Sequence, residues 1–155
     1  MKKPHSEKAR LQVAALPLRH GADGSVEVLL VTTRTTKRWT VPKGWPIKGL
    51  KAHEAAAREA AEEAGVIGKI CKRPLAEYLY WKQCADGPIL CRVKLFKLRV
   101  DRRLDTWPEK AERRQQWFKF SDAADLVGEP GLGAIMRSLK VEFARAPAPE
   151  PLAAE

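Results

Sequence analysis

Apolar and polar residues follow several different spacings along this chain, and each spacing predicts a different element of secondary structure. Residues 11–17 and 26–34 are rich in apolar side chains, and residues 21–24 between them have the Gly and Asp content of a tight turn. These two stretches are expected to pair as a hairpin. A short apolar stretch at residues 39–41 comes next, and a loop rich in Gly and Lys, residues 43–49, follows it.

A helix is predicted over residues 52–64, which are dense in the good helix formers Ala and Glu. Gly65 stands at the position where a left-handed C-terminal cap would end this helix. Residues 66–81 then predict one strand or two, and residues 89–100 predict another, with the turn-forming residues 85–88 between them.

The last third of the chain changes character twice. Residues 101–114 are charged and show no clear periodicity, whereas residues 116–120 predict a strand. The Ser and Asp at 121–122 suit the N-cap of a short helix over residues 123–127, and a further helix is predicted over residues 131–144. The apolar face of that last helix carries Leu132, Ile135, Met136 and Leu139.

The predicted elements run in the order strands, helix, strands, helices. This order indicates an α/β (α+β) fold, in which helices cover the faces of a mixed β-sheet, rather than a series of repeating βαβ units. The length of 155 residues fits one domain, which we place at residues 11–145. Residues 1–10 are expected to form a flexible N-terminus, and the Pro- and Ala-rich residues 146–155 a disordered tail.

The chain is strongly basic, with 29 Lys and Arg against 19 Asp and Glu and a net charge of +10. The charge predicts an anionic partner, which could be nucleic acid, an anionic membrane surface or a small polyphosphorylated molecule. No apolar run approaches the length of about 20 residues that spans a bilayer, and the first residues do not resemble a secretory signal. We therefore expect a cytoplasmic protein that is not associated with a membrane. The three Cys lack a C-x-x-C pair, which argues against a disulfide framework or a zinc site.

Three glutamates in the predicted helix point to metal chemistry. Glu59, Glu62 and Glu63 are spaced i, i+3 and i+4, so their carboxylates project from one side of the helix within a single turn. Such a cluster repels itself unless solvent or a hard cation neutralises it, and Mg²⁺ prefers oxygen ligands of this kind. Taken alone, the spacing is more typical of a solvated acidic stripe than of a metal site.

The surrounding residues change that interpretation. After Gly44 come thirteen residues and then the segment at 58–66, which reads Arg-Glu-Ala-Ala-Glu-Glu-Ala-Gly-Val. This spacing closely resembles the Nudix box, the loop and helix signature of the Nudix hydrolases. Residues 38–44 and 116–123 also resemble the corresponding stretches of one branch of this family. That branch contains the diphosphoinositol polyphosphate and diadenosine polyphosphate phosphohydrolases. The resemblance extends over residues 11–143 and implies an αβα sandwich with a mixed sheet.

One position departs from the family pattern. Leu50 stands where the box has a glutamate that is thought to support the loop and pair with the arginine. Glu54 lies one helical turn before Arg58, so we expect it to take over this pairing. Arg58 would then orient the carboxylates, and Leu50→Glu is expected to leave the rate unchanged and to raise stability slightly.

The resemblance implies roles for particular residues. Mg²⁺, or Mn²⁺ in its place, would be held by Glu59, Glu62, Glu63 and the backbone carbonyl of Gly44. Glu63 is our first choice as general base, with Glu109 or Glu112 in reserve. Basic residues before and around the box are expected to bind substrate phosphates, namely Lys37, Arg38, Lys43, Lys48 and Lys51.

The expected activity is metal-dependent hydrolysis of a diphosphate or polyphosphate linkage in a small phosphorylated substrate. Diadenosine polyphosphates and diphosphoinositol polyphosphates are favoured over nucleoside triphosphates and RNA 5′ ends. The alternative from another class is a noncatalytic protein, either a basic nucleic-acid-binding module or a scaffold. That alternative leaves three aligned glutamates without a use, and nucleic acid is therefore a partner that we do not favour. The oligomeric state is open.

Overall fold

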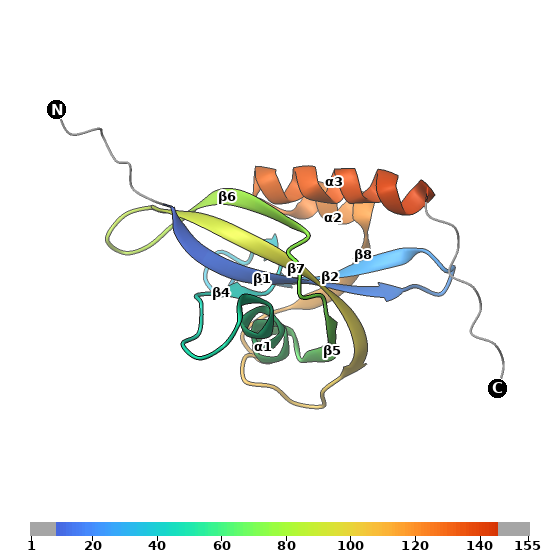
Figure 1. Cartoon of the computed structure of the whole chain (residues 1–155), viewed down its shortest axis with the longest axis horizontal. Coiled ribbons are helices and arrows are strands. Elements are labelled where there is room, and N and C mark those ends of the chain that lie inside the picture. Colours follow the sequence, from blue (N-terminus) through green and yellow to red (C-terminus); the bar gives the residue numbers. More distant parts are fainter. Residues whose placement is uncertain (1–8, 146–155) are drawn as a thin grey trace.

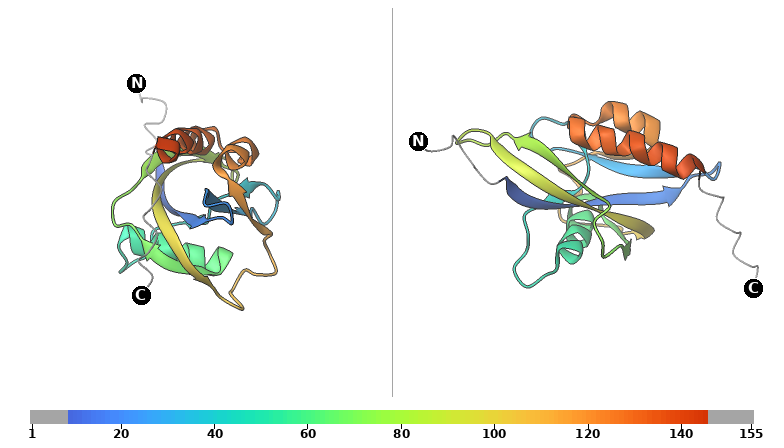
Figure 2. Two further views of the ribbon diagram at one scale, coloured as in Figure 1. Left: turned by 90° about the vertical axis from the view of Figure 1, so that its right-hand side faces the viewer. Right: turned by 45° about the horizontal axis from the view of Figure 1, so that its top comes forward.

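Helices cover both faces of a mixed β-sheet in the computed structural model, which describes residues 9–145 (Figure 1). Helix α1 packs on one face, and α2 and α3 pack on the other (Figure 2). The sandwich predicted from the element order is therefore confirmed. The strands are β1 (Arg10–His20), β2 (Val26–Thr32), β3 (Trp39–Thr40), β4 (Lys43–Gly44), β5 (Val66–Ile70), β6 (Ala76–Lys82), β7 (Ile89–Arg103) and β8 (Gln115–Lys119). The helices are α1 (Ala52–Ala64), α2 (Phe120–Leu126) and α3 (Pro130–Arg145).

The parallel strands β1 and β7 form the centre of the sheet. Their pairing runs from Arg10 opposite Cys91 to Leu18 opposite Arg99, and the main strand order is β3-β2-β1-β7-β5. Beyond that point the two strands separate. The end of β1 pairs with β2, while the end of β7 pairs with β5. The sheet thus divides at one end, and β8 joins the β2 side of the division.

Small side chains bring α1 close to the sheet. Ala55, Ala56, Ala60 and Ala64 are buried against a core that contains Val13, Leu29 and Phe96. Alanine has no bulk beyond Cβ, so the helix backbone approaches the strands closely. The opposite core contains Leu132, Met136 and Leu139 of α3, with Ile135 packed against it, which confirms the predicted apolar face.

The stretch at 66–81, predicted to hold one strand or two, forms two. The observed boundaries correct the sequence predictions in two other places. Strand β7 continues to Arg103, inside the segment without periodicity. The short helix α2 begins at Phe120, with Lys119 in the extended N-cap conformation, so Ser121 and Asp122 lie in its first turn. The start moves because Phe120 is buried in the core and carries β8 directly into the helix.

Two further predictions concern the ends of the chain. The proposed tail at 146–155 and residues 1–8 of the proposed flexible N-terminus lie outside the described residues. Strand β1 already begins at Arg10, one residue before the predicted domain boundary. Within residues 9–145, every helix is too short or too polar to cross a membrane.

Candidate active site

Both ends of α1 are held by specific contacts. At the N-terminal end, the backbone N–H of Lys51 donates to Glu54 Oε1 at 2.8 Å. The expected pair between Glu54 and Arg58 is absent from the ion pairs of the described residues, and Arg58 is exposed. That prediction was wrong because the first turn of a helix has unpaired N–H groups, and the Glu54 carboxylate turns back to satisfy one of them.

Gly65 ends the helix as predicted, in the left-handed conformation with φ of 66° and its N–H bonded to Ala61 O at 3.1 Å. The Trp107 ring lies directly against Gly65, in the space that a Cβ atom would need. Leu104 N–H also donates to Gly65 O at 2.7 Å. The absence of a side chain therefore lets the segment at 104–114 dock on the C-terminal end of α1.

The docked segment places Glu109 beside the glutamates of α1. Glu109 N–H donates to Glu62 O at 3.1 Å, which attaches the segment to the helix backbone. Burial raises the pKa of Glu59, and the charges of Glu62 and Glu109 raise it further. The side chains predicted as metal ligands therefore meet Glu109, a residue from a distant part of the sequence.

Glu63 is the most enclosed member of this group. It is 7% exposed, and its burial raises its pKa to about 8, although the nearby Arg113 guanidinium acts in the opposite direction. The charges of Glu59 and Glu109 add to the increase. A carboxyl group enclosed in this way is neutral or needs a cation near it.

Arg113 is the functional residue that sequence reasoning missed. Its Nε and Nη2 lie 3.0 Å and 2.9 Å from Glu109 Oε1, and its Nη1 donates to Thr32 O at 3.0 Å. Nη2 also lies 3.8 Å from Glu63 Oε2. The residue lies in the charged segment at 101–114, for which the sequence predicts no element. No spacing in the sequence signals its contact with α1, because that contact depends on the docked segment.

Gly44 is adjacent to the glutamates, as the box predicts. A Cβ atom on Gly44 would overlap the Glu59 carboxylate, so a side chain here would displace that carboxylate. Leu50, at the position of the missing box glutamate, packs against the core beneath α1. An apolar contact therefore stands where the family has a charged one.

The carboxylates offer the donor chemistry of a hard divalent cation, although they are not arranged as a finished metal site. In the described part of the chain, no three acidic, His or Cys side chains converge closely enough to hold an ion. The charges of Glu62 and Glu109 nevertheless raise the pKa of Glu59, and the charges of Glu59 and Glu109 raise the pKa of Glu63. Their oxygens match the preference of Mg²⁺ or Mn²⁺, and the donor set fits such an ion once the side chains rotate toward it.

The predicted phosphate-binding residues divide into two groups. Lys43 is 12% exposed in its side chain, and its Nζ donates to Thr40 Oγ1 at 2.8 Å and to Glu129 Oε1 at 3.2 Å. It is therefore largely occupied within the protein. The other four side chains are exposed and, among residues 9–139, whose side chains the structure describes, have no hydrogen-bond or ion-pair partner: Lys37, Arg38, Lys48 and Lys51.

The two reserve candidates for the general base differ in their surroundings. Glu109 has a side chain 19% exposed and is held by Arg113, whereas Glu112 is 49% exposed and lies 3.7 Å from Arg34 Nη1.

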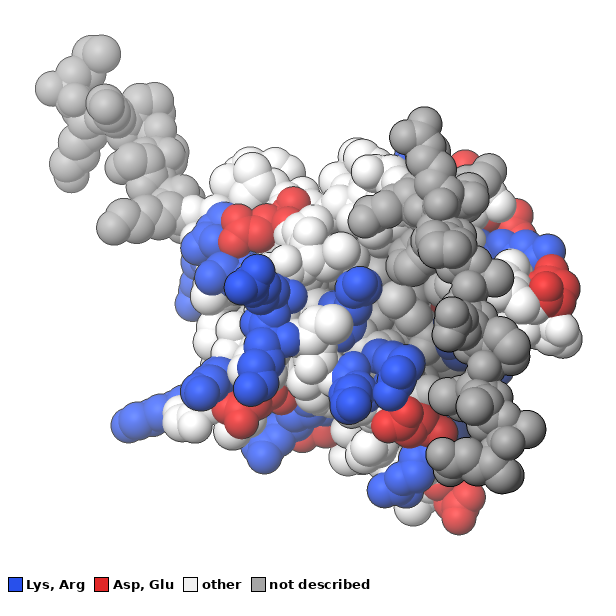
Figure 3. Space-filling model, turned by 45° about the vertical axis from the view of Figure 1, so that its right-hand side comes forward, with Lys and Arg blue, Asp and Glu red and all other residues white. Residues whose placement is uncertain are grey.

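Lys and Arg side chains gather across the face shown in Figure 3, with Asp and Glu in smaller groups among them. The acidic cluster is thus set in a protein of opposite overall charge.

These features agree with what the comparisons with known proteins find. A family model described as the NUDIX domain matches residues 8–139, and the chain therefore belongs to the Nudix family. A similar protein is the Nudix hydrolase 12, mitochondrial, of Arabidopsis thaliana, which is 32% identical over 108 residues, covering 65% of this chain and 52% of that protein. Another is the diphosphoinositol polyphosphate phosphohydrolase 3-alpha of Mus musculus, 38% identical over 104 residues, covering 65% and 60%.

The aligned part is thus between about half and three fifths of the length of these two relatives. Among solved structures, a binary complex of a C. elegans Ap4A hydrolase matches with a TM-score of 0.66 at 22% identity. That match covers 88% of this chain and 98% of the other, and it shows a common fold.

Proposed function

We propose that this protein is a hydrolase that cleaves a diphosphate or polyphosphate linkage with the help of a bound divalent ion, Mg²⁺ or Mn²⁺. The observation that carries the proposal is the acidic cluster beside Gly44, in which the charge of Glu109 opposes the ionisation of Glu59 and of Glu63. Carboxylates enclosed together in this way are costly to a protein unless they serve a ligand.

A diphosphate bridge resists hydrolysis because its negative oxygens repel an incoming nucleophile. A bound divalent ion would neutralise part of that charge and acidify a water molecule. In this chain Glu59, Glu62 and Glu63 would hold the ion, with the carbonyl of Gly44 as a further ligand. Because Arg58 is exposed, we assign the orientation of the carboxylates to Arg113 instead.

Glu63 remains our first choice for the general base, and Glu109 is the stronger of the two reserves. Arg113 holds the Glu109 carboxylate at 2.9 Å, and the backbone of Glu109 is bonded to α1, so this side chain has a defined position beside the cluster. Glu112 is more exposed and pairs outward with Arg34, which makes it the weaker reserve.

For the substrate we favour a diadenosine polyphosphate or a diphosphoinositol polyphosphate. The names of the similar proteins support these two classes, since one is a diphosphoinositol polyphosphate phosphohydrolase and another an Ap4A hydrolase. The side chains at 37, 38, 48 and 51 are exposed cations that could contact a chain of phosphates. Nucleoside triphosphates and RNA 5′ ends form the second choice.

The deciding experiment is a product-release assay over a panel of diadenosine polyphosphates, diphosphoinositol phosphates, nucleoside triphosphates, ADP-ribose and triphosphorylated RNA. Each substrate is tested with Mg²⁺, with Mn²⁺ and with EDTA. We expect metal-dependent cleavage of one class, which would name the substrate. If nothing is cleaved while RNA binds equally well in EDTA, the protein is a noncatalytic binder and the proposal fails.

A further inference from the structure

A pocket of about 420 Å³ opens at the end of the sheet where β1 and β7 separate. The division of the sheet creates it, because strands that no longer pair leave a gap between the β2–β8 side and the β5–β7 side. None of its lining residues belongs to the acidic cluster. The lining residues that we use below are Arg19, Leu29, Val66, Val100, Arg103, Gln115 and Trp117.

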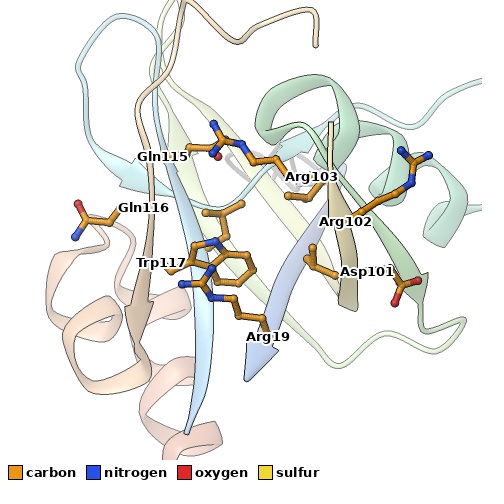
Figure 4. A pocket seen from close by; sticks show the side chains of 10 residues that line it. Arg19, Asp101, Arg102, Arg103, Gln115, Gln116 and Trp117 are labelled. Carbon is orange, nitrogen blue, oxygen red and sulfur yellow. The ribbon is translucent and has the colours of Figure 1, made fainter. Parts of the chain in front are cut away.

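Two arginines of the lining, Arg19 and Arg103, lie over tryptophan rings. The Arg19 guanidinium stacks over the Trp117 ring at 4.3 Å from its centroid, and its Nε donates to Glu27 Oε1 at 2.9 Å. The Arg103 guanidinium lies 5.1 Å from the centroid of the Trp107 ring. Figure 4 shows both side chains reaching across the gap toward β8. Their remaining N–H groups are donors that suit a phosphate.

The other groups of the pocket suit a planar or apolar moiety. Val100 and the almost fully buried Leu29 and Val66 line the pocket with apolar atoms, and Gln115 donates through Nε2 to Ala64 O at 2.7 Å. That bond fixes the Gln115 amide and leaves its Oε1 as an acceptor. The acidic side chain in the lining, Asp101, turns outward in Figure 4. The interior is therefore apolar and cationic.

We propose that this pocket is a second ligand site, separate from the acidic cluster, and that it binds a nucleoside monophosphate. The two guanidinium groups would hold the phosphate, the apolar residues would contact the base, and the Gln115 amide would accept a hydrogen bond from its edge. A volume of about 420 Å³ is within the range of sites for small molecules of this size. The proposal does not depend on whether the protein is a hydrolase.

The test is isothermal titration calorimetry of the full chain with AMP, in EDTA so that no metal ion can recruit phosphate to the acidic cluster. Inorganic phosphate and adenosine are titrated as partial ligands. We expect one AMP per chain, bound more tightly than either part. Arg19→Gln and Arg103→Gln should each weaken AMP binding by about tenfold or more, because each removes a charged donor.

Arg99→Gln is the matched control, because it removes one positive charge from the exposed side of the same strand, outside the pocket. It should change AMP binding less than about twofold. As a readout that needs no variant, AMP should shift the NMR signals of the Trp117 indole N–H and the Gln115 side-chain amide. Three results would each overturn the proposal: no AMP binding, an equal loss in Arg99→Gln, or phosphate binding as tightly as AMP.

Discussion

At the scale of single residues, the acidic side chains of α1 carry the proposed chemistry. The backbone carbonyl of Glu62 accepts from Glu109 N–H, and Glu63 is almost fully enclosed. As ligands of a divalent ion, both glutamates would be ionised carboxylates, which an uncharged amide of the same shape cannot replace. Replacing either glutamate by glutamine therefore tests the site while the fold is kept.

Glu62→Gln and Glu63→Gln are each expected to lower turnover by about two orders of magnitude or more, because each removes one charged metal oxygen with little change of shape. The measurement is the initial rate on the cleaved substrate at saturating Mg²⁺. Glu77→Gln on β6, whose side chain is 43% exposed, is the charge-matched control and should retain full rate. Full activity in both α1 variants would show that the site has been assigned to the wrong residues.

Arg113 is expected to contribute both stability and orientation. Its side chain is 11% exposed and contacts two acidic residues, so Arg113→Gln leaves their charges without a partner. Breaking an ion pair enclosed to this degree costs about 3 kcal/mol. Urea unfolding should show the loss, and Arg114→Gln, an exposed cation beside it, should unfold like the wild type. The idea fails if the two variants are equally stable.

The hairpin turn contains a carboxylate whose ionised form is favoured by the fold. Asp23 Oδ1 accepts from the hydroxyl and the N–H of Ser25 at 2.6 Å and 3.0 Å, and Lys119 Nζ lies 3.2 Å from Oδ2. The Ser25 hydrogen bonds, with Lys119, hold the pKa of Asp23 well below its usual value. Ionised Asp23 therefore stabilises the folded state at pH values above the pKa that it has in the unfolded chain. This contribution is lost as the pH falls through the lower pKa that Asp23 has in the folded protein.

We expect Asp23→Asn to lower Tm at about pH 6 and the difference from wild type to shrink steadily below about pH 4. Differential scanning calorimetry over this range measures the effect. If the difference in Tm between Asp23→Asn and wild type stays constant as the pH falls, the turn does not require the ionised carboxylate.

At the scale of elements, the junction between α1 and the segment at 104–114 decides whether the site assembles. Gly65 is the point of closest approach, since it combines a φ of 66° with the Trp107 ring against its Cα. A side chain here would oppose both the backbone conformation and the docking of the segment.

Gly65→Ala should therefore destabilise the protein by more than the about 1 kcal/mol that a left-handed alanine costs alone. Gly24→Ala is the control, because Gly24 also has positive φ, of 82°, yet a Cβ there would meet nothing within 4 Å. Chemical unfolding of both variants separates the two contributions. Equal losses would mean that Trp107 yields to the new methyl group at no cost.

Leu50 is a second place where packing revises an expectation from the sequence. Because Leu50 packs against the core beneath α1, Leu50→Glu should lower stability by about 1–2 kcal/mol rather than raise it, while the rate per folded molecule stays the same. Leu50→Met, which keeps the apolar volume, is the control. Thermal unfolding and the rate assay together test this, and a gain in Tm for Leu50→Glu would restore the original expectation.

At the scale of the whole molecule, the divided sheet provides two separate regions for anions. One lies beside Gly44, where an acidic cluster in a basic protein requires a cation before it can meet phosphate. The other is the arginine-lined gap between the ends of β1 and β7. A net charge of +10 favours the approach of phosphorylated molecules to either region.

The sequence by itself determined the features that depend on local spacing. The bounds of α1, the alignment of Glu59, Glu62 and Glu63, and the glycine that ends the helix follow from propensity and from the helical repeat. The apolar face of α3 follows from the same periodicity. These features involve neighbours within a turn or two, and such neighbours are visible in the order of the residues.

Tertiary structure alone decided which distant side chains meet. Arg113 reaches Glu63, Trp107 covers Gly65 and Glu129 engages Lys43, although each pair is separated by about forty residues or more. A charged segment without periodicity has no pattern that predicts its partners, so its docking on α1 appears only once the sheet and helix have assembled. The physical reason is that burial and pairing energies depend on distance in space, whereas spacing in the sequence reports only on contacts within an element.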